Sequence, residues 1–70
     1  MADIERITMN LSTAAKSAMT RATDITGENK TETVNHALIL YAIICEAQDK
    51  GGAVYIQRDK DAKQERILIL

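Results

Sequence analysis

The 70-residue chain has a formal net charge of −1, and 46% of its residues are hydrophobic. A chain this short forms one domain whose core is marginal unless a disulfide, a metal or oligomerisation supplements it. A lone cysteine (Cys45) excludes an internal disulfide, and a lone histidine (His36) argues against zinc, so oligomerisation remains. The near-neutral charge gives no overall basic signature for nucleic acid, although the charge at a contact surface is what decides.

The first predicted element is a strand over residues 5–11. Polar and apolar side chains alternate strictly along Arg6, Ile7, Thr8, Met9, Asn10 and Leu11. This alternation is typical of a strand with one buried and one open face. A lone strand is not stable in water, and the stretches that follow it indicate helices. We therefore expect it to pair, antiparallel, with the same strand of a second copy of the chain.

A first helix is predicted after this strand. Ser12 and Thr13 can each cap its start, and Gly27 supplies a stop where a left-handed backbone costs least. One face carries small or apolar residues at helical spacing, namely Ala15, Ala18, Met19, Ala22 and Ile25. Because most of these side chains are alanine, this helix is expected to approach its neighbour closely.

A second helix is predicted from a cap at Thr31 to about Asp49, with Glu32 in its first turn, where the helix dipole favours negative charge. One face is marked by Val34, Ala37, Leu38, Tyr41 and Cys45. The isoleucines and leucines between them fill most of the remaining circumference. A helix that is apolar nearly all round is expected to be buried nearly all round, which two interlocked copies can achieve.

The region after the second helix is predicted to be a β-hairpin with a long polar loop. Lys50-Gly51-Gly52 ends the helix, residues 53–57 and 66–70 resemble strands, and residues 58–65 form a charged connection. We expect two parts, a dimerisation and binding domain over residues 1–50 and a hairpin extension over residues 51–70. The longest apolar run, 37–45, is too short to cross a bilayer, and no secretory leader is expected at the amino terminus.

The order of strand, capped helix, glycine, polar loop and capped helix over residues 5–48 resembles the ribbon-helix-helix family of bacterial and phage DNA-binding proteins. The fold class that this implies is mostly α with a short β ribbon, in an intertwined homodimer. The resemblance also implies that paired ribbons read the DNA major groove with Arg6, Thr8 and Asn10. It implies phosphate contacts at the start of the second helix, from Asn29, Lys30 and Thr31. The expected dimer core comprises Ile7, Met9, Leu11, Val34, Leu38 and Tyr41.

These assignments compete with simpler interpretations. The polar row of the strand is by default an ordinary solvated face, and the cap at Thr31 is by default only a cap. Lys16 and Arg21 are more simply solvated than bound to flanking phosphates. His36 has no nucleophile or acid at a suggestive spacing, and Cys45 lies in an apolar run typical of an inert thiol. We expect no enzyme activity, no cofactor and no metal.

The sequence therefore predicts a cytoplasmic, repressor-type transcription regulator of a bacterium or phage-infected host. Its expected partners are a second copy of itself, with higher-order assembly on DNA left open, and double-stranded DNA, but no membrane. Two alternatives remain. One is an antitoxin or adaptor whose apolar tail, residues 66–70, captures a partner protein. The other is a dimeric scaffold that does not bind DNA, which the acidic pI permits.

Overall fold

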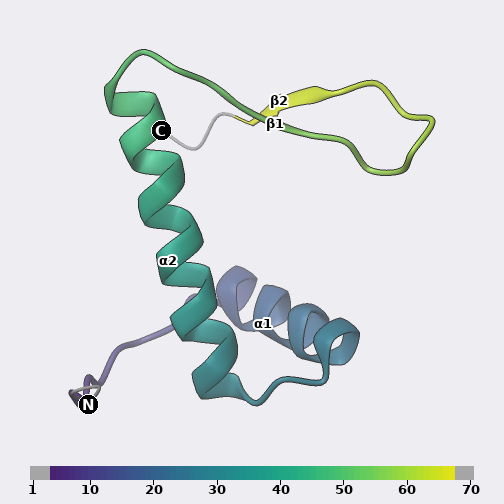
Figure 1. The fold of residues 1–70 in the computed structure, drawn as a ribbon. Coiled ribbons are helices and arrows are strands. Elements are labelled where there is room, and N and C mark those ends of the chain that lie inside the picture. Colours follow the sequence, from purple (N-terminus) through teal and green to yellow (C-terminus); the bar gives the residue numbers. More distant parts are fainter. Residues whose placement is uncertain (1–3, 68–70) are drawn as a thin grey trace. The chain divides into compact units, whose positions relative to one another are not determined.

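The computed structural model describes residues 4–67. Figure 1 shows two helices followed by two short strands: α1 (Thr13–Thr26), α2 (Lys30–Asp49), β1 (Val54–Ile56) and β2 (Glu65–Ile67). The chain is thus mostly helical with a small antiparallel sheet, as the sequence predicts. It divides within α2, between Val34 and Asn35, into two compact units. Neither described helix combines the length and apolar content that a bilayer crossing requires.

Helix α1 begins and ends where the sequence predicts. Ser12 has an extended backbone (φ −66°, ψ 162°), and its hydroxyl oxygen accepts from the N–H of Ala15 at 3.0 Å. At the other end Gly27 adopts the left-handed conformation (φ 75°), and its N–H donates to the carbonyl of Thr23 at 2.9 Å. These two contacts satisfy backbone groups that a helix end otherwise leaves without partners.

Helix α2 is capped by Asn29, so the predicted cap at Thr31 is wrong. The Asn29 Oδ1 accepts from the N–H of Glu32 at 2.8 Å, and the Glu32 Oε1 accepts in return from the N–H of Asn29 at 3.4 Å. This reciprocal pair is a capping box. Thr31 is instead the second residue of the helix, which begins at Lys30. The box places a carboxylate over the first turn.

The carboxyl end of α2 is closed by two glycines. Gly51 has a left-handed backbone (φ 78°), and its N–H donates to the carbonyl oxygen of Gln48. The N–H of Gly52 donates to the carbonyl oxygen of Ala47. This double contact is a Schellman motif, and it confirms the predicted helix stop. A Cβ added at Gly52 would lie 2.9 Å from the carbonyl oxygen of Ala47, so the tight exit requires glycine at this position too.

The predicted hairpin is present and shorter than expected within the described residues. The register pairs Val54 with Ile67, Tyr55 with Arg66 and Ile56 with Glu65. The first strand covers three residues rather than the predicted 53–57. The second begins at Glu65, one residue earlier than expected. Residues 68–70 of the predicted strand lie outside the described residues.

The loop of the hairpin is held by side chains. The Gln57 amide donates to the carbonyls of Lys60 and Ala62, at 3.1 and 2.9 Å. The Asp59 carboxylate accepts from the N–H of Asp61 at 2.8 Å, and the Arg58 guanidinium pairs with Glu65 at 2.9 Å. The side chain of Gln57 thus closes the loop where it leaves the first strand.

No described residue is buried within the single chain. Large apolar side chains are exposed in both units, including Ile25 (84%) and Ile39 (62%). The most enclosed residues, among them Met19, Val34, Ile44 and Val54, are only half-buried. The hydrophobic core that 46% apolar content predicts is therefore absent from the described part of one chain.

Candidate nucleic-acid interface

In the predicted recognition segment, residues 5–11, both the polar and the apolar row of side chains are exposed. The polar residues Arg6, Thr8 and Asn10 are exposed, and the apolar residues alternating with them are exposed as well, Ile7 by 63%, Met9 by 59% and Leu11 by 49%. The described residues 4–11 form neither helix nor strand in the single chain. A strand requires a hydrogen-bonded neighbour, and the neighbour expected here belongs to a second copy. The ribbon over residues 5–11 therefore stays a prediction.

The end of this segment is fixed by the cap of α1. Ser12 keeps an extended backbone, and its carbonyl accepts from the N–H of Lys16 at 2.9 Å as the first helical hydrogen bond. The chain thus changes from extended to helical between Ser12 and Thr13. A segment that ends in an extended residue directly after the alternating run is compatible with a strand there. Lys16 and Arg21 are exposed on α1, where Arg21 donates to the Ser17 hydroxyl at 3.0 Å.

The start of α2 carries the predicted phosphate-contacting residues, Asn29, Lys30 and Thr31, all exposed. The capping box uses the amides of Asn29 and Glu32. Of the donors in this turn, it leaves the N–H groups of Lys30 and Thr31 unused. These groups and the positive end of the helix dipole favour an anion. The negative charge of the Glu32 carboxylate in the same turn repels an anion. Net attraction for an anion therefore depends on the Lys30 side chain and the backbone N–H donors.

The residues expected in the dimer core on α2 lie on one face of the helix but are not covered in the single chain. Val34 is half-buried, Leu38 is 55% exposed and Tyr41 is 41% exposed. A hydrogen bond to the side chain of Cys45, one turn further on, raises the pKa of the Tyr41 hydroxyl, and charge on Cys45 and burial act in the same direction. The hydroxyl therefore stays protonated at neutral pH, with its proton engaged by Cys45.

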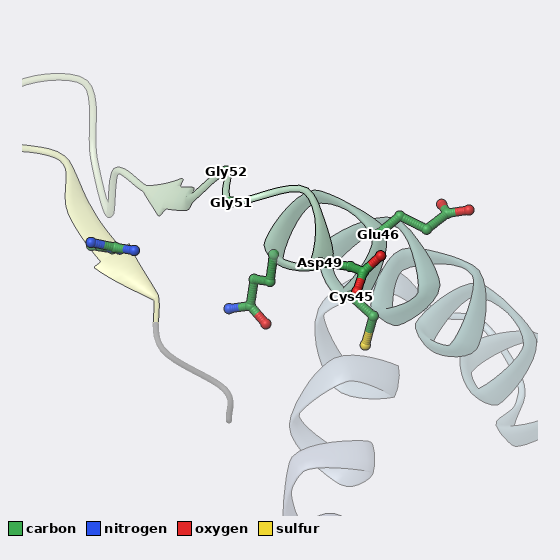
Figure 2. Close-up of a pocket in the computed structure, with 7 residues that line it drawn as sticks. Cys45, Glu46, Asp49, Gly51 and Gly52 are labelled. Atoms are coloured by element: carbon green, nitrogen blue, oxygen red, sulfur yellow. The ribbon is translucent and has the colours of Figure 1, made fainter.

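A groove at the carboxyl end of α2 was not foreseen from the sequence. It encloses about 780 Å³ and is lined by Cys45, Glu46, Gln48, Asp49, Gly51, Gly52 and Arg66. Figure 2 shows Cys45 and Glu46 leaving the helix in different directions, so they do not converge on one point. Among the described residues no group of three histidine, cysteine or acidic side chains is placed to hold a metal ion. We assign no chemistry to this groove.

Sequence reasoning also missed the cap at Asn29, although its signal is present. Asn29 and Glu32 have the spacing of a capping box, three residues apart before an apolar run.

Comparison of the chain with protein-family models, curated proteins and solved structures found no match.

Proposed function

We propose that the chain is a sequence-specific, DNA-binding transcription regulator of repressor type that acts as an intertwined homodimer. In this dimer, residues 5–11 of two copies pair into a ribbon that enters the major groove, which is wide enough for two strands. The observation that carries the proposal is the exposure of the alternating segment 5–11, whose polar and apolar side chains are both in contact with water. This segment directly precedes the capped helix α1, and none of the described residues of the chain is buried.

The exposed apolar side chains support association of the chain. Large apolar residues of both units are exposed, for example Ile25 by 84% in the first unit and Ile39 by 62% in the second. Exposed apolar surface of this kind is typical of an interaction site. Pairing of the ribbons would place Ile7, Met9 and Leu11 on one side, where the helices of the dimer can cover them, and would leave the polar row facing outward.

The polar row has the chemistry of base recognition. Arginine can donate two hydrogen bonds to guanine, asparagine can pair twice with adenine, and threonine can contact either a base edge or the thymine methyl group. Each good bidentate pair gives about 1–3 kcal/mol of discrimination. Two-fold pairing would present Arg6, Thr8 and Asn10 twice, so the expected operator is a palindromic or repeated half-site.

The order of the described tail supports the regulator over the adaptor. An adaptor of the antitoxin type would keep its tail free to fold on a partner. In this chain the described part of that tail, Arg66 and Ile67, is paired with β1 in the hairpin. The scaffold alternative is distinguished by salt, since phosphate contacts make DNA affinity fall steeply as salt rises and a scaffold would show no such binding.

The test is selection of bound fragments from random DNA, followed by titration of the selected site with single variants. We expect Arg6→Ala and Asn10→Ala each to relax the preference at one position of each half-site, at a cost of about 1–3 kcal/mol per lost bidentate pair. Arg21→Ala is the matched control, because it removes the same charge from the exposed side of α1 and should weaken all sequences equally. Unchanged sequence preference in both Arg6→Ala and Asn10→Ala would refute the assignment.

A further inference from the structure

Ile4 is the most exposed large apolar side chain among the described residues, at 95%. It directly precedes the alternating segment 5–11. Successive side chains along a strand point to opposite faces, so residues two apart share a face. In a strand that includes it, Ile4 therefore shares a row with the proposed base-reading residues, Arg6, Thr8 and Asn10.

The paired ribbon can extend as far as Ile4. When residues 5–11 of two copies pair antiparallel, the two-fold axis passes beside Thr8, and Ile4 lies opposite Ser12 of the other copy. Ser12 has an extended backbone (φ −66°, ψ 162°), and α1 begins only at Thr13. An extended residue is therefore available opposite Ile4, and the alternation of side chains can continue to that position.

The row on which Ile4 lies, rather than its exposure, gives it a target. Single exposed apolar residues are common on protein surfaces, so exposure alone decides nothing. The helices of the dimer would cover the opposite row and leave Ile4 on the side that faces the DNA. In the major groove an apolar side chain has a specific partner there, because thymine presents a C5-methyl group and the other bases do not.

We propose that Ile4 is a further specificity-determining residue, whose side chain contacts the methyl group of one thymine in each half-site of the operator. The proposal rests on the proposed DNA-binding function. Two residues of an antiparallel strand span about 7 Å, and one base-pair step spans about 3.4 Å. The thymine is therefore expected about two base pairs further from the operator centre than the base that Arg6 reads.

The test removes the methyl group from the DNA and leaves the protein intact. Thymines of the selected operator are replaced, one symmetric pair at a time, by deoxyuridine, which lacks only the C5-methyl group. We expect one such pair, outside the position read by Arg6, to weaken binding about fourfold for each half-site, because one methyl group is no longer buried. The Ile4→Ala variant should bind the thymine and deoxyuridine operators equally well.

Two further variants are matched controls. Ile4→Val keeps a branched apolar side chain and should retain most of the dependence on the methyl group. Glu5→Ala changes the adjacent residue on the opposite row and should retain all of it. Because Ile4 is exposed, its variants should keep the urea midpoint of the unmodified protein. A methyl dependence that persists unchanged in Ile4→Ala, or an operator in which no thymine methyl group matters, would overturn the proposal.

The outcomes separate this proposal from the proposed function. Relaxed sequence preference in Arg6→Ala and Asn10→Ala, together with a methyl dependence that does not respond to Ile4→Ala, would uphold recognition by the ribbon and refute the contact of Ile4. An unmodified protein with no sequence preference would refute the proposed function and the Ile4 contact together.

Discussion

Replacement of Glu32 by glutamine is expected to raise DNA affinity while it lowers the stability of the protein. Glu32 lies in the first turn of α2, beside the proposed phosphate site formed by Lys30 and the amide of Thr31. At a separation of about 6–8 Å in water, a carboxylate and a phosphate repel each other by about 0.5–0.7 kcal/mol. Two such sites per dimer amount to about 1 kcal/mol, or about fivefold in the dissociation constant.

The cost to stability is expected to be small. The hydrogen bond from the N–H of Asn29 to the Glu32 Oε1 is long, 3.4 Å, and a glutamine oxygen can accept it equally well. What is lost is the attraction between the carboxylate and the helix dipole, about 0.3–1 kcal/mol per chain. Affinity and stability should thus change in opposite directions, which a general loss of structure cannot produce.

The assay is fluorescence anisotropy with the selected operator at low and high salt, combined with urea unfolding of the free protein. Glu46→Gln is the matched control, because it makes the same charge change about 21 Å along α2, beyond the screening length of about 10 Å at 0.1 M salt. Its affinity should equal that of the unmodified protein. An affinity for the Glu32→Gln variant that is unchanged or weaker at low salt would refute the placement of phosphate at this turn.

Two further predictions concern helix ends. Asn29→Ala should lower the free energy of unfolding by about 1 kcal/mol per chain, because it removes the side-chain acceptor of the 2.8 Å bond, whereas Thr31→Ala should change it by less than about 0.5 kcal/mol. Urea denaturation measures both, and a larger loss for Thr31→Ala would contradict the cap assignment. Gly52→Ala should cost about 1–3 kcal/mol, because the new Cβ meets the Ala47 carbonyl oxygen at 2.9 Å. Gly51→Ala has open space and should cost about 1 kcal/mol for its left-handed backbone alone, so equal thermal shifts for the two glycine variants would rule out the steric explanation.

The helix ends were predictable because their signals are local. Ser12 and Gly27 fall where a hydroxyl cap and a left-handed residue are needed, and the structure confirms both. At α2 the sequence offers two candidate caps, Asn29 and Thr31, two residues apart. The side-chain oxygen of Glu32 decides between them, because it can reach back to the N–H of Asn29 and complete the box.

The exact strand bounds and the burial could not be predicted in the same way. A two-residue turn fixes the register of a hairpin, but the loop between Ile56 and Glu65 is long, and side chains within it set its geometry. The burial of a side chain depends also on the molecule that packs against it, and the sequence of one chain does not say which molecule that is. The periodicity of Ile7, Met9 and Leu11 indicates which side of a strand faces inward, but not which molecule covers it.

Because the amide of Gln57 holds the hairpin loop, substitutions are expected to be tolerated at some positions of the loop and not at others. Its two contacts go to the main-chain oxygens of Lys60 and Ala62, so the side chains at those two positions can vary without altering the contacts. Glutamate at position 57 would occupy nearly the same space, but it would bring a negative oxygen against two carbonyls and supply no donor. A change at the tip of the hairpin is therefore expected to be tolerated where it keeps this amide and the positions of the two carbonyls that it contacts.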